Sequence, residues 1–180
     1  MKVVAVFGGA GVQPGSDVYE QSYLVGKTVA EAGCAVMTGG YGGVMGAASQ
    51  GASEAGGHVI GVTVASFSIQ GERNVNQWIT EEIEYPDLRP RLHYLVDKAD
   101  AYIVMPGGVG TLQEIAEVWQ QMRTGDIVGR PLIGYGDFWK TTLAEFRKSP
   151  YIPQHQRDVM QFVDNSDDLL TILEAIKETV

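Results

Sequence analysis

Cysteine and long hydrophobic runs are scarce in this chain of 180 residues. The single cysteine, Cys34, has no partner for an intramolecular disulfide, and its apolar neighbours favour a buried thiol over a reactive one. The apolar run that opens the chain ends at Gly8 and is too short for a secretory signal or a membrane span. We therefore expect a cytoplasmic protein that does not enter a membrane.

Positive charge is also scarce. Lysine and arginine number 13 against 22 aspartates and glutamates, which gives a formal charge of −9. Because nucleic acids and anionic membranes are bound through many cationic contacts, we expect neither as a partner, whereas a small anion can bind where a few arginines converge. His58, His93 and His155 stand far apart without the spacing of metal ligands, so we expect no metal.

Apolar stretches of strand length alternate with amphipathic stretches of helical length along the chain, which is typical of a parallel sheet covered by helices on both faces. We predict a single α/β domain over residues 1–180, a Rossmann-like three-layer sandwich with a mostly parallel central sheet of about six or seven strands. The expected strands are 3–7, 35–38, 59–62, 79–85, 101–105, 131–135 and 159–163. The expected helices are 17–32, 44–55, 88–98, 111–123, 138–147 and 167–178, with Ser166 as the N-cap of the last and a long loop at 65–76 near the site.

Glycine, by contrast, is abundant: the chain has 23 glycines, and ten of them form three clusters that each follow a predicted strand. A glycine turn between a strand and a helix lets a ligand approach the backbone and directs N–H groups at an anion. Tight turns without a ligand would explain one cluster, but three clusters at one edge of a parallel sheet favour a phosphate site. The clusters are Gly8-Gly9-Ala10-Gly11, Gly39-Gly40-Tyr41-Gly42-Gly43 and Gly107-Gly108-Val109-Gly110.

Two common nucleotide motifs are incomplete. The dinucleotide fingerprint starts at Gly9 but lacks its third glycine, and the second predicted strand ends without the acid that would hold a ribose. The tripeptide Gly26-Lys27-Thr28 resembles the end of a P-loop, but Gln21 replaces the first glycine and the tripeptide falls within a predicted helix. Hydride transfer with a nicotinamide cofactor is therefore not expected.

The segment from Pro106 to Glu114, Pro-Gly-Gly-Val-Gly-Thr-Leu-Gln-Glu, joins a predicted strand to a predicted helix. The N–H groups of Gly108, Gly110 and Thr111 are suited to hold a phosphate. Glu114, placed in the first helical turn, would be kept ionised by the helix N-terminus and serve as a base. Thr111 and Glu114 also fit a capping box that only satisfies backbone donors, but this alternative leaves the glycines unexplained.

With these motifs the chain resembles the LONELY GUY (LOG) family of cytokinin-activating phosphoribohydrolases, many of whose members were once labelled lysine decarboxylases. The family motif PGGxGTxxE matches residues 106–114, and its GGxxGxMG element matches residues 39–46. The MxxRK motif aligns with residues 88–92, where Arg91 is the arginine and Leu88 and Leu92 replace the methionine and the lysine. The resemblance runs from residue 3 to about residue 135, and no lysine stands in a context that would support a decarboxylase.

The resemblance implies hydrolysis of the N-glycosidic bond of an AMP-like nucleoside 5′-monophosphate, with Arg91 and Glu114 as the catalytic pair and without a metal or cofactor. It also implies a homodimer or higher homo-oligomer, in which the helix of Trp119 and Met122 packs on its own sheet or against a second copy. An alternative is a binding protein that holds a nucleotide or a phosphorylated cofactor, such as the molybdenum cofactor, without cleaving it. The expected phosphate and nucleotide ligands are Gly8, Gly9, Gly39, Gly40, Gly43, Met45, Gly107, Gly108, Gly110 and Thr111.

Overall fold

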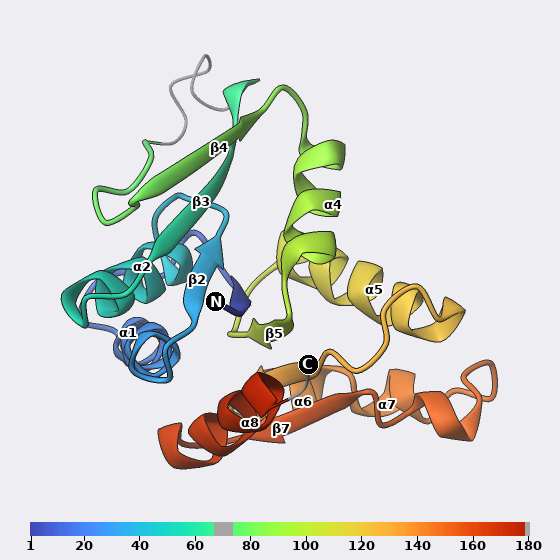
Figure 1. The fold of residues 1–180 in the computed structure, drawn as a ribbon. Helices are drawn as coiled ribbons and strands as arrows, with labels where there is room; N and C mark the ends of the chain where they lie inside the picture. The colour runs from blue at the N-terminus through green and yellow to red at the C-terminus, as the bar shows by residue number, and fades with distance from the viewer. Residues whose placement is uncertain (67–73, 179–180) are drawn as a thin grey trace.

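The computed structural model describes residues 1–66 and 74–178 and contains one seven-stranded sheet (Figure 1). The strand order is β4-β3-β2-β1-β5-β6-β7, and every pair of neighbouring strands is parallel, which confirms the predicted α/β class. The strands are β1 (Val3–Phe7), β2 (Ala35–Thr38), β3 (Val59–Val64), β4 (Glu81–Tyr85), β5 (Ala101–Val104), β6 (Leu132–Tyr135) and β7 (Met160–Val163).

Helices cover both faces of this sheet (Figure 1). One face packs against α1 (Asp17–Glu31), α2 (Val44–Glu54) and α8 (Ser166–Glu178) through a core of valines, alanines and leucines. The other face packs against α4 (Leu88–Lys98), α5 (Val109–Thr124) and α6 (Asp137–Thr142), followed by α7 (Ala144–Arg147) and a 3-10 turn at Gln154–Gln156. No helix among the described residues is long and apolar enough to cross a membrane.

The order of the strands places a topological switch point at the centre of the sheet. From β1 the chain adds strands outward to β4, and it then returns to the other side of β1 with β5 and continues to β7. The connections that leave β1 and β5 therefore run in opposite directions and open a crevice beyond the carboxyl ends of these two neighbours. Two of the three glycine clusters follow these strands.

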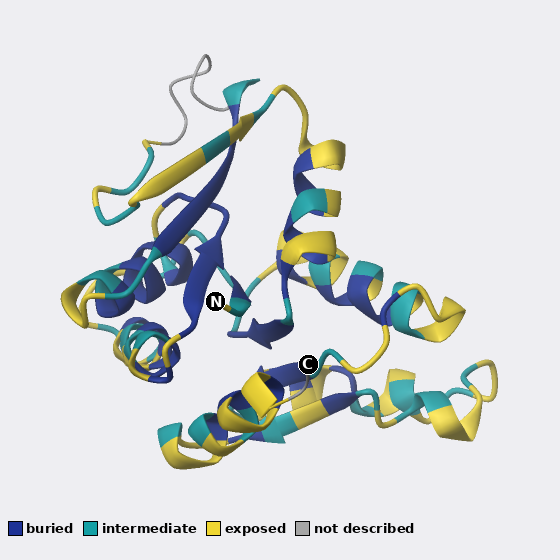
Figure 2. Cartoon of the chain, in the orientation of Figure 1, coloured by how far each residue is buried: buried dark blue, intermediate teal, exposed yellow. Residues whose placement is uncertain are grey.

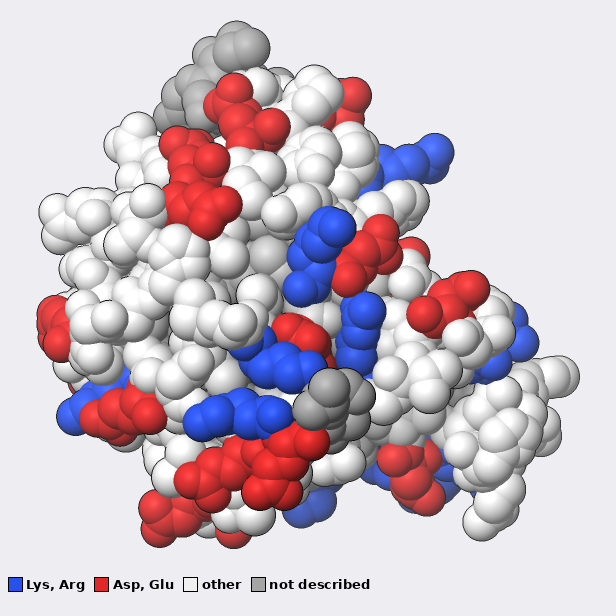
Figure 3. Space-filling model, viewed as in Figure 1, with Lys and Arg blue, Asp and Glu red and all other residues white. Residues whose placement is uncertain are grey.

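Burial explains why some strands are continuous apolar runs and one is not. Every residue of β2, β3, β5 and β6 is buried, because both faces of these strands are covered (Figure 2). The edge strand β4 instead exposes Glu81, Glu82 and Glu84, and acidic side chains gather over it in Figure 3. Charged residues along an edge discourage pairing with a further strand.

Several predicted boundaries were wrong. Helix α5 begins at Val109, before the predicted Thr111, because Gly108 acts as its N-cap. The helix predicted at 138–147 is divided at Leu143 into α6 and α7. Ser166 belongs to α8, whose cap is Asn165, because the Asn165 Oδ1 accepts the Asp168 N–H at 2.9 Å.

The start of the edge strand β4 also differs from the predicted one. Strand β4 begins at Glu81 rather than at residue 79, and the Thr80 hydroxyl just before it bonds both the N–H and the carbonyl of Val59. Of the predicted loop 65–76, residues 67–73 lie outside the described residues. Its last residue, Asn76, bonds the second glycine cluster through its N–H, which donates to the Gly40 carbonyl at 2.9 Å.

Candidate functional site

Backbone hydrogen bonds join the three glycine clusters at the switch point. The Gly9 N–H donates to the Pro106 carbonyl at 3.0 Å, and the Val44 N–H donates to the Gly9 carbonyl at 3.0 Å. These bonds connect the ends of β1 and β5 and the start of α2 into one floor. Glycine is needed at Gly43, whose φ of +65° is left-handed and where a Cβ would overlap the Gly9 carbonyl oxygen.

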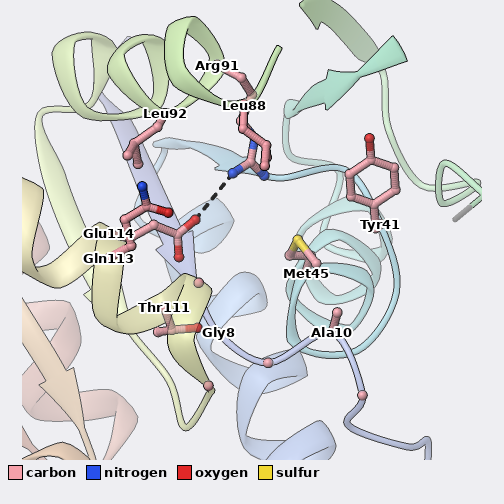
Figure 4. Close-up of a pocket in the computed structure, with 14 residues that line it drawn as sticks. Gly8, Ala10, Tyr41, Met45, Leu88, Arg91, Leu92, Thr111, Gln113 and Glu114 are labelled. Atoms are coloured by element: carbon pink, nitrogen blue, oxygen red, sulfur yellow. Dashed lines mark hydrogen bonds and ion pairs between the residues drawn. The ribbon is translucent and has the colours of Figure 1, made fainter. Parts of the chain in front are cut away.

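A cavity of about 460 Å³ lies above this floor, between α4 and the N-termini of α2 and α5 (Figure 4). The first turn of α5 leaves backbone N–H groups without acceptors inside the helix, which makes this end of the cavity suited to an anion. The cavity is lined by Gly8, Gly9, Ala10, Gly11, Tyr41, Met45, Leu88, Arg91, Leu92, Gly108, Gly110, Thr111, Gln113 and Glu114.

The structure separates the predicted ligand-binding residues into two groups. Gly8, Gly9, Met45, Gly108, Gly110 and Thr111 line the cavity, together with the predicted catalytic pair. In the described part of the chain, Gly39, Gly40, Gly43 and Gly107 lie outside the lining, at positions where a Cβ would collide with neighbouring atoms. At Gly107, for example, a Cβ would overlap the Thr111 hydroxyl.

Sequence reasoning did not single out some residues of the cavity wall. Tyr41 lies inside the second glycine cluster, and its buried hydroxyl accepts the Val64 N–H at 2.8 Å. Gln113 directly precedes Glu114 on α5, in the variable part of the family motif. A tyrosine between glycines was the one signal in the sequence that could have pointed to Tyr41. No pattern marked Gln113 or Ala10.

An ion pair between Arg91 and Glu114 crosses the cavity from α4 to α5 (Figure 4). The Arg91 Nη1 lies 3.4 Å from the Glu114 Oε1, and the two side chains are only 10% and 13% exposed. The Arg91 Nε donates a second hydrogen bond, at 3.0 Å, to the Val62 carbonyl of β3. The pair is therefore held by the sheet as well as by the two helices.

Burial raises the pKa of Glu114 to about 7, although the positive charge and hydrogen bond of Arg91 act in the opposite direction. The expectation that the helix N-terminus keeps Glu114 ionised was wrong, because α5 starts at Val109 and Glu114 falls in its second turn. The alternative capping box is not formed either, since the N-cap is Gly108 and the Glu114 carboxylate bonds Arg91. A carboxyl group with this pKa exchanges protons readily near neutrality.

Arg91 is the only lysine or arginine among the described residues that line the cavity. Leu92, which stands at the family's lysine position, is buried in the wall, and Leu88 lies beside it. Arg89 and Lys98 are exposed elsewhere on α4, and Arg73 lies outside the described residues. Within residues 1–66 and 74–178, no group of three histidine, cysteine or acidic side chains is arranged to hold a metal ion.

Solved structures share the whole fold at low sequence identity. The molybdenum cofactor binding protein from Rippkaea orientalis superposes with a TM-score of 0.76 and 23% identity, covering 98% of this chain and 97% of its own. The molybdenum cofactor carrier protein from Chlamydomonas reinhardtii superposes with a TM-score of 0.74 and 19% identity, covering 98% of both chains. At these identities, the likeness establishes the fold alone.

Sequence relatives define the family. The family profile described as "Possible lysine decarboxylase" matches residues 45–173. The chain is 34% identical over 149 residues to the cytokinin riboside 5'-monophosphate phosphoribohydrolase LOG5 of Arabidopsis thaliana, a match that covers 79% of this chain but only 63% of that protein. It is 30% identical over 162 residues to the cytokinin riboside 5'-monophosphate phosphoribohydrolase of Mycobacterium marinum, covering 86% and 84%. These matches and the motifs around Arg91 and Glu114 show that the chain belongs to the LONELY GUY (LOG) family.

Proposed function

We propose that this protein hydrolyses the N-glycosidic bond of a nucleoside 5′-monophosphate and releases the free base and ribose 5-phosphate. The observation that carries this proposal is the buried Arg91–Glu114 pair, which faces a cavity whose other end is the N-terminus of α5. The relatives named for this reaction support it, including the Mycobacterium marinum protein, which the match covers to 84%.

The two ends of the cavity have different tasks in this proposal. The N–H groups of Gly108, Gly110 and Thr111 bind the phosphate, aided by the positive end of the α5 dipole. Gly8 and Gly9 let the sugar phosphate approach the backbone closely. Gly39, Gly40, Gly43, Met45 and Gly107 complete the proposed nucleotide site, the glycines by shaping its floor.

Glu114 acts on the attacking water. The water oxygen bonds to C1′ of the ribose while the Glu114 carboxylate accepts a proton from it. The electron pair of the broken C1′–N bond leaves with the base, which takes up a proton from solvent and departs as the neutral free base, while Glu114 returns the proton that it accepted to solvent. The transition state has the character of a ribosyl cation, which a carboxylate stabilises, and Arg91 keeps that carboxylate oriented.

Release of the free base from AMP and from isopentenyladenosine monophosphate, followed by chromatography, tests this proposal. Glu114→Gln preserves the shape of the side chain and removes its ability to accept a proton, so we expect turnover to be lost. Glu117→Gln, a half-buried carboxylate on the same helix and outside the cavity lining, is the matched control and should retain turnover. Equal rates in the wild type and Glu114→Gln would contradict the proposed role.

One observation favours a second candidate, a binding protein without turnover. Leu92 replaces the family's lysine, so Arg91 is the one cation of the described lining, and it is already paired with Glu114. A nucleotide or phosphorylated cofactor would then be held mainly by backbone N–H groups. Saturable binding of AMP to the wild type, with no base released, would support this candidate over the enzyme.

We also infer self-association through a second cavity, of about 620 Å³, between α5 and the segment from α6 to the 3-10 turn. Its wall combines buried Trp119 with the exposed aromatic side chains of Phe146 and Tyr151, which are 58% and 92% accessible. Trp119 thus packs on its own sheet and also faces this cavity, while Met122 is packed against the same core. Light scattering should show a dimer that Phe146→Glu dissociates. A monomeric wild type at micromolar concentration would contradict the inference.

A further inference from the structure

Gly39 lies directly against the guanidinium group of Arg91, at the carboxyl end of β2. A Cβ at this position would overlap the Arg91 Nη2 and lie 3.1 Å from its Cζ, and it would lie 2.6 Å from the Met45 Sδ. The backbone itself does not demand glycine here, because Gly39 is absent from the residues with positive φ among those described. The requirement is therefore for space, and Arg91 occupies that space.

Two further contacts determine where the guanidinium group lies. Its Nε donates to the Val62 carbonyl at 3.0 Å, and its Nη1 bonds the Glu114 carboxylate at 3.4 Å. The Nη2 side of the same planar group meets Gly39. A planar group held on one edge by a backbone carbonyl has little freedom to swing away from an added methyl group without losing its other contacts.

We propose that Gly39 is a positioning residue: its missing side chain seats the Arg91 guanidinium and thereby orients the Glu114 carboxylate toward the cavity. Gly39 does this without lining the cavity itself. The kinetic consequence rests on the proposed phosphoribohydrolase function. The geometry of the pair does not, because it is measurable without turnover.

Met45 is the other neighbour of residue 39, but its side chain is not the reason that this position requires glycine. Its thioether stands at the end of a flexible, unbranched side chain that can move away from the added methyl group. Arg91 has no such freedom, because movement of its guanidinium breaks the bond to Val62 or the pair with Glu114. A methyl group at residue 39 is therefore expected to act on Arg91.

The variant Gly39→Ala tests whether Gly39 positions Arg91, and Gly42→Ala is the matched control from the same cluster. A Cβ on Gly42 meets no atom within 4 Å, and Gly42 is exposed with no positive φ. We expect Gly39→Ala to lower kcat by roughly 100-fold with little change in KM, because misplacing a reacting group acts on the chemical step. Gly42→Ala should behave as the wild type.

Titration of the Glu114 carboxyl by carbon-13 NMR gives a readout that needs no substrate. Displacing Arg91 removes the positive charge that lowers the pKa of Glu114, so this pKa should rise above about 7 in Gly39→Ala and stay unchanged in Gly42→Ala. An unchanged Glu114 titration in folded Gly39→Ala would overturn the proposal. If the wild type releases no base, the proposed function fails, while the titration still decides the role of Gly39.

The Arg91→Lys background distinguishes two roles of Gly39, the positioning of Arg91 and a direct contact with the nucleotide. Lysine has a single terminal nitrogen and no counterpart of Nη2, so Gly39→Ala should have little additional effect on the Glu114 titration when combined with Arg91→Lys. Equal effects of Gly39→Ala in the two backgrounds would overturn the proposal. If Gly39→Ala alone does not fold, the double variant Gly39→Ala/Arg91→Lys decides. Folding of the double variant supports the positioning role of Gly39, and failure to fold overturns it.

Discussion

The Arg91 Nε donates a hydrogen bond of 3.0 Å to the Val62 carbonyl, which ties a side chain of α4 to strand β3. Arg91 is therefore positioned by the protein's own backbone, and Glu114, paired with it at 3.4 Å, is positioned as well. Charged groups that are oriented in advance stabilise developing charge without paying for reorganisation during the reaction.

The first prediction concerns the pH dependence of activity. The pKa of Glu114 is raised to about 7 by burial, and the proposed base must be ionised to accept a proton from water. The ratio kcat/KM should therefore rise with pH through about 7 and level off above it. A rate profile across this interval tests the assignment. A profile that is flat through neutrality would exclude Glu114 as the base.

The second prediction concerns stability. Because the pKa of Glu114 is higher in the folded protein than the ordinary value of 4.5, the folded state binds this proton more tightly than the unfolded chain. The free energy of unfolding should therefore fall as pH rises from about 4.5 to about 7, by roughly 3 kcal/mol in total from this group. Urea denaturation of the wild type and of Glu114→Gln should show the loss only in the wild type. Parallel pH dependences would refute the shift.

The third prediction concerns the missing lysine. Leu92 lines the cavity, so Leu92→Lys would bring a second cation to its wall. A charge-assisted contact with phosphate should lower the Kd for AMP by roughly tenfold. Calorimetric titration measures this change, and Leu92→Met, which restores length without charge, is the control. Weaker binding by Leu92→Lys than by Leu92→Met would show that the phosphate lies out of reach of this position.

The fourth prediction concerns the crossing of α1 and α2. Gly26 lies within α1, and a Cβ on it would overlap the Ala48 carbonyl of α2. Gly26→Ala should lower the free energy of unfolding by about 1–3 kcal/mol, because overpacking outweighs the better helix propensity of alanine. Chemical denaturation beside Gly42→Ala measures the difference. A stabilised Gly26→Ala would mean that the two helices separate freely.

The fifth prediction concerns the support of the second glycine cluster. The Asn76 side-chain amide donates to the Tyr41 carbonyl at 3.0 Å and to the Ser49 hydroxyl at 3.3 Å. Asn76→Ala should therefore cost about 1–3 kcal/mol of stability, since buried acceptors lose their donors. Asn76→Asp keeps the shape but replaces the donating amide with an acceptor, so thermal unfolding should show a loss there as well. Wild-type stability in both variants would refute this role.

Much of the architecture followed from local patterns. Short apolar runs are buried strands because both faces of the parallel sheet are covered, and the clusters after β1, β2 and β5 lie at one edge because parallel strands end together. Helix boundaries were less accurate. Gly108 caps α5 without any side chain, and Leu143 is both the C-cap of α6 and the N-cap of α7.

The sequence by itself determined the α/β class, the glycine turns and the two residues that form the ion pair. The class follows from alternating apolar and amphipathic stretches, and the turns and the two residues belong to short sequence motifs. Only the tertiary structure decided that Gly39 lies against Arg91 and that Val62 holds its Nε, since these residues belong to separate elements that meet only in the folded chain. It also decided the charge behaviour of Glu114. A pKa is set by burial and by neighbouring charges, and neither exists before the chain has folded.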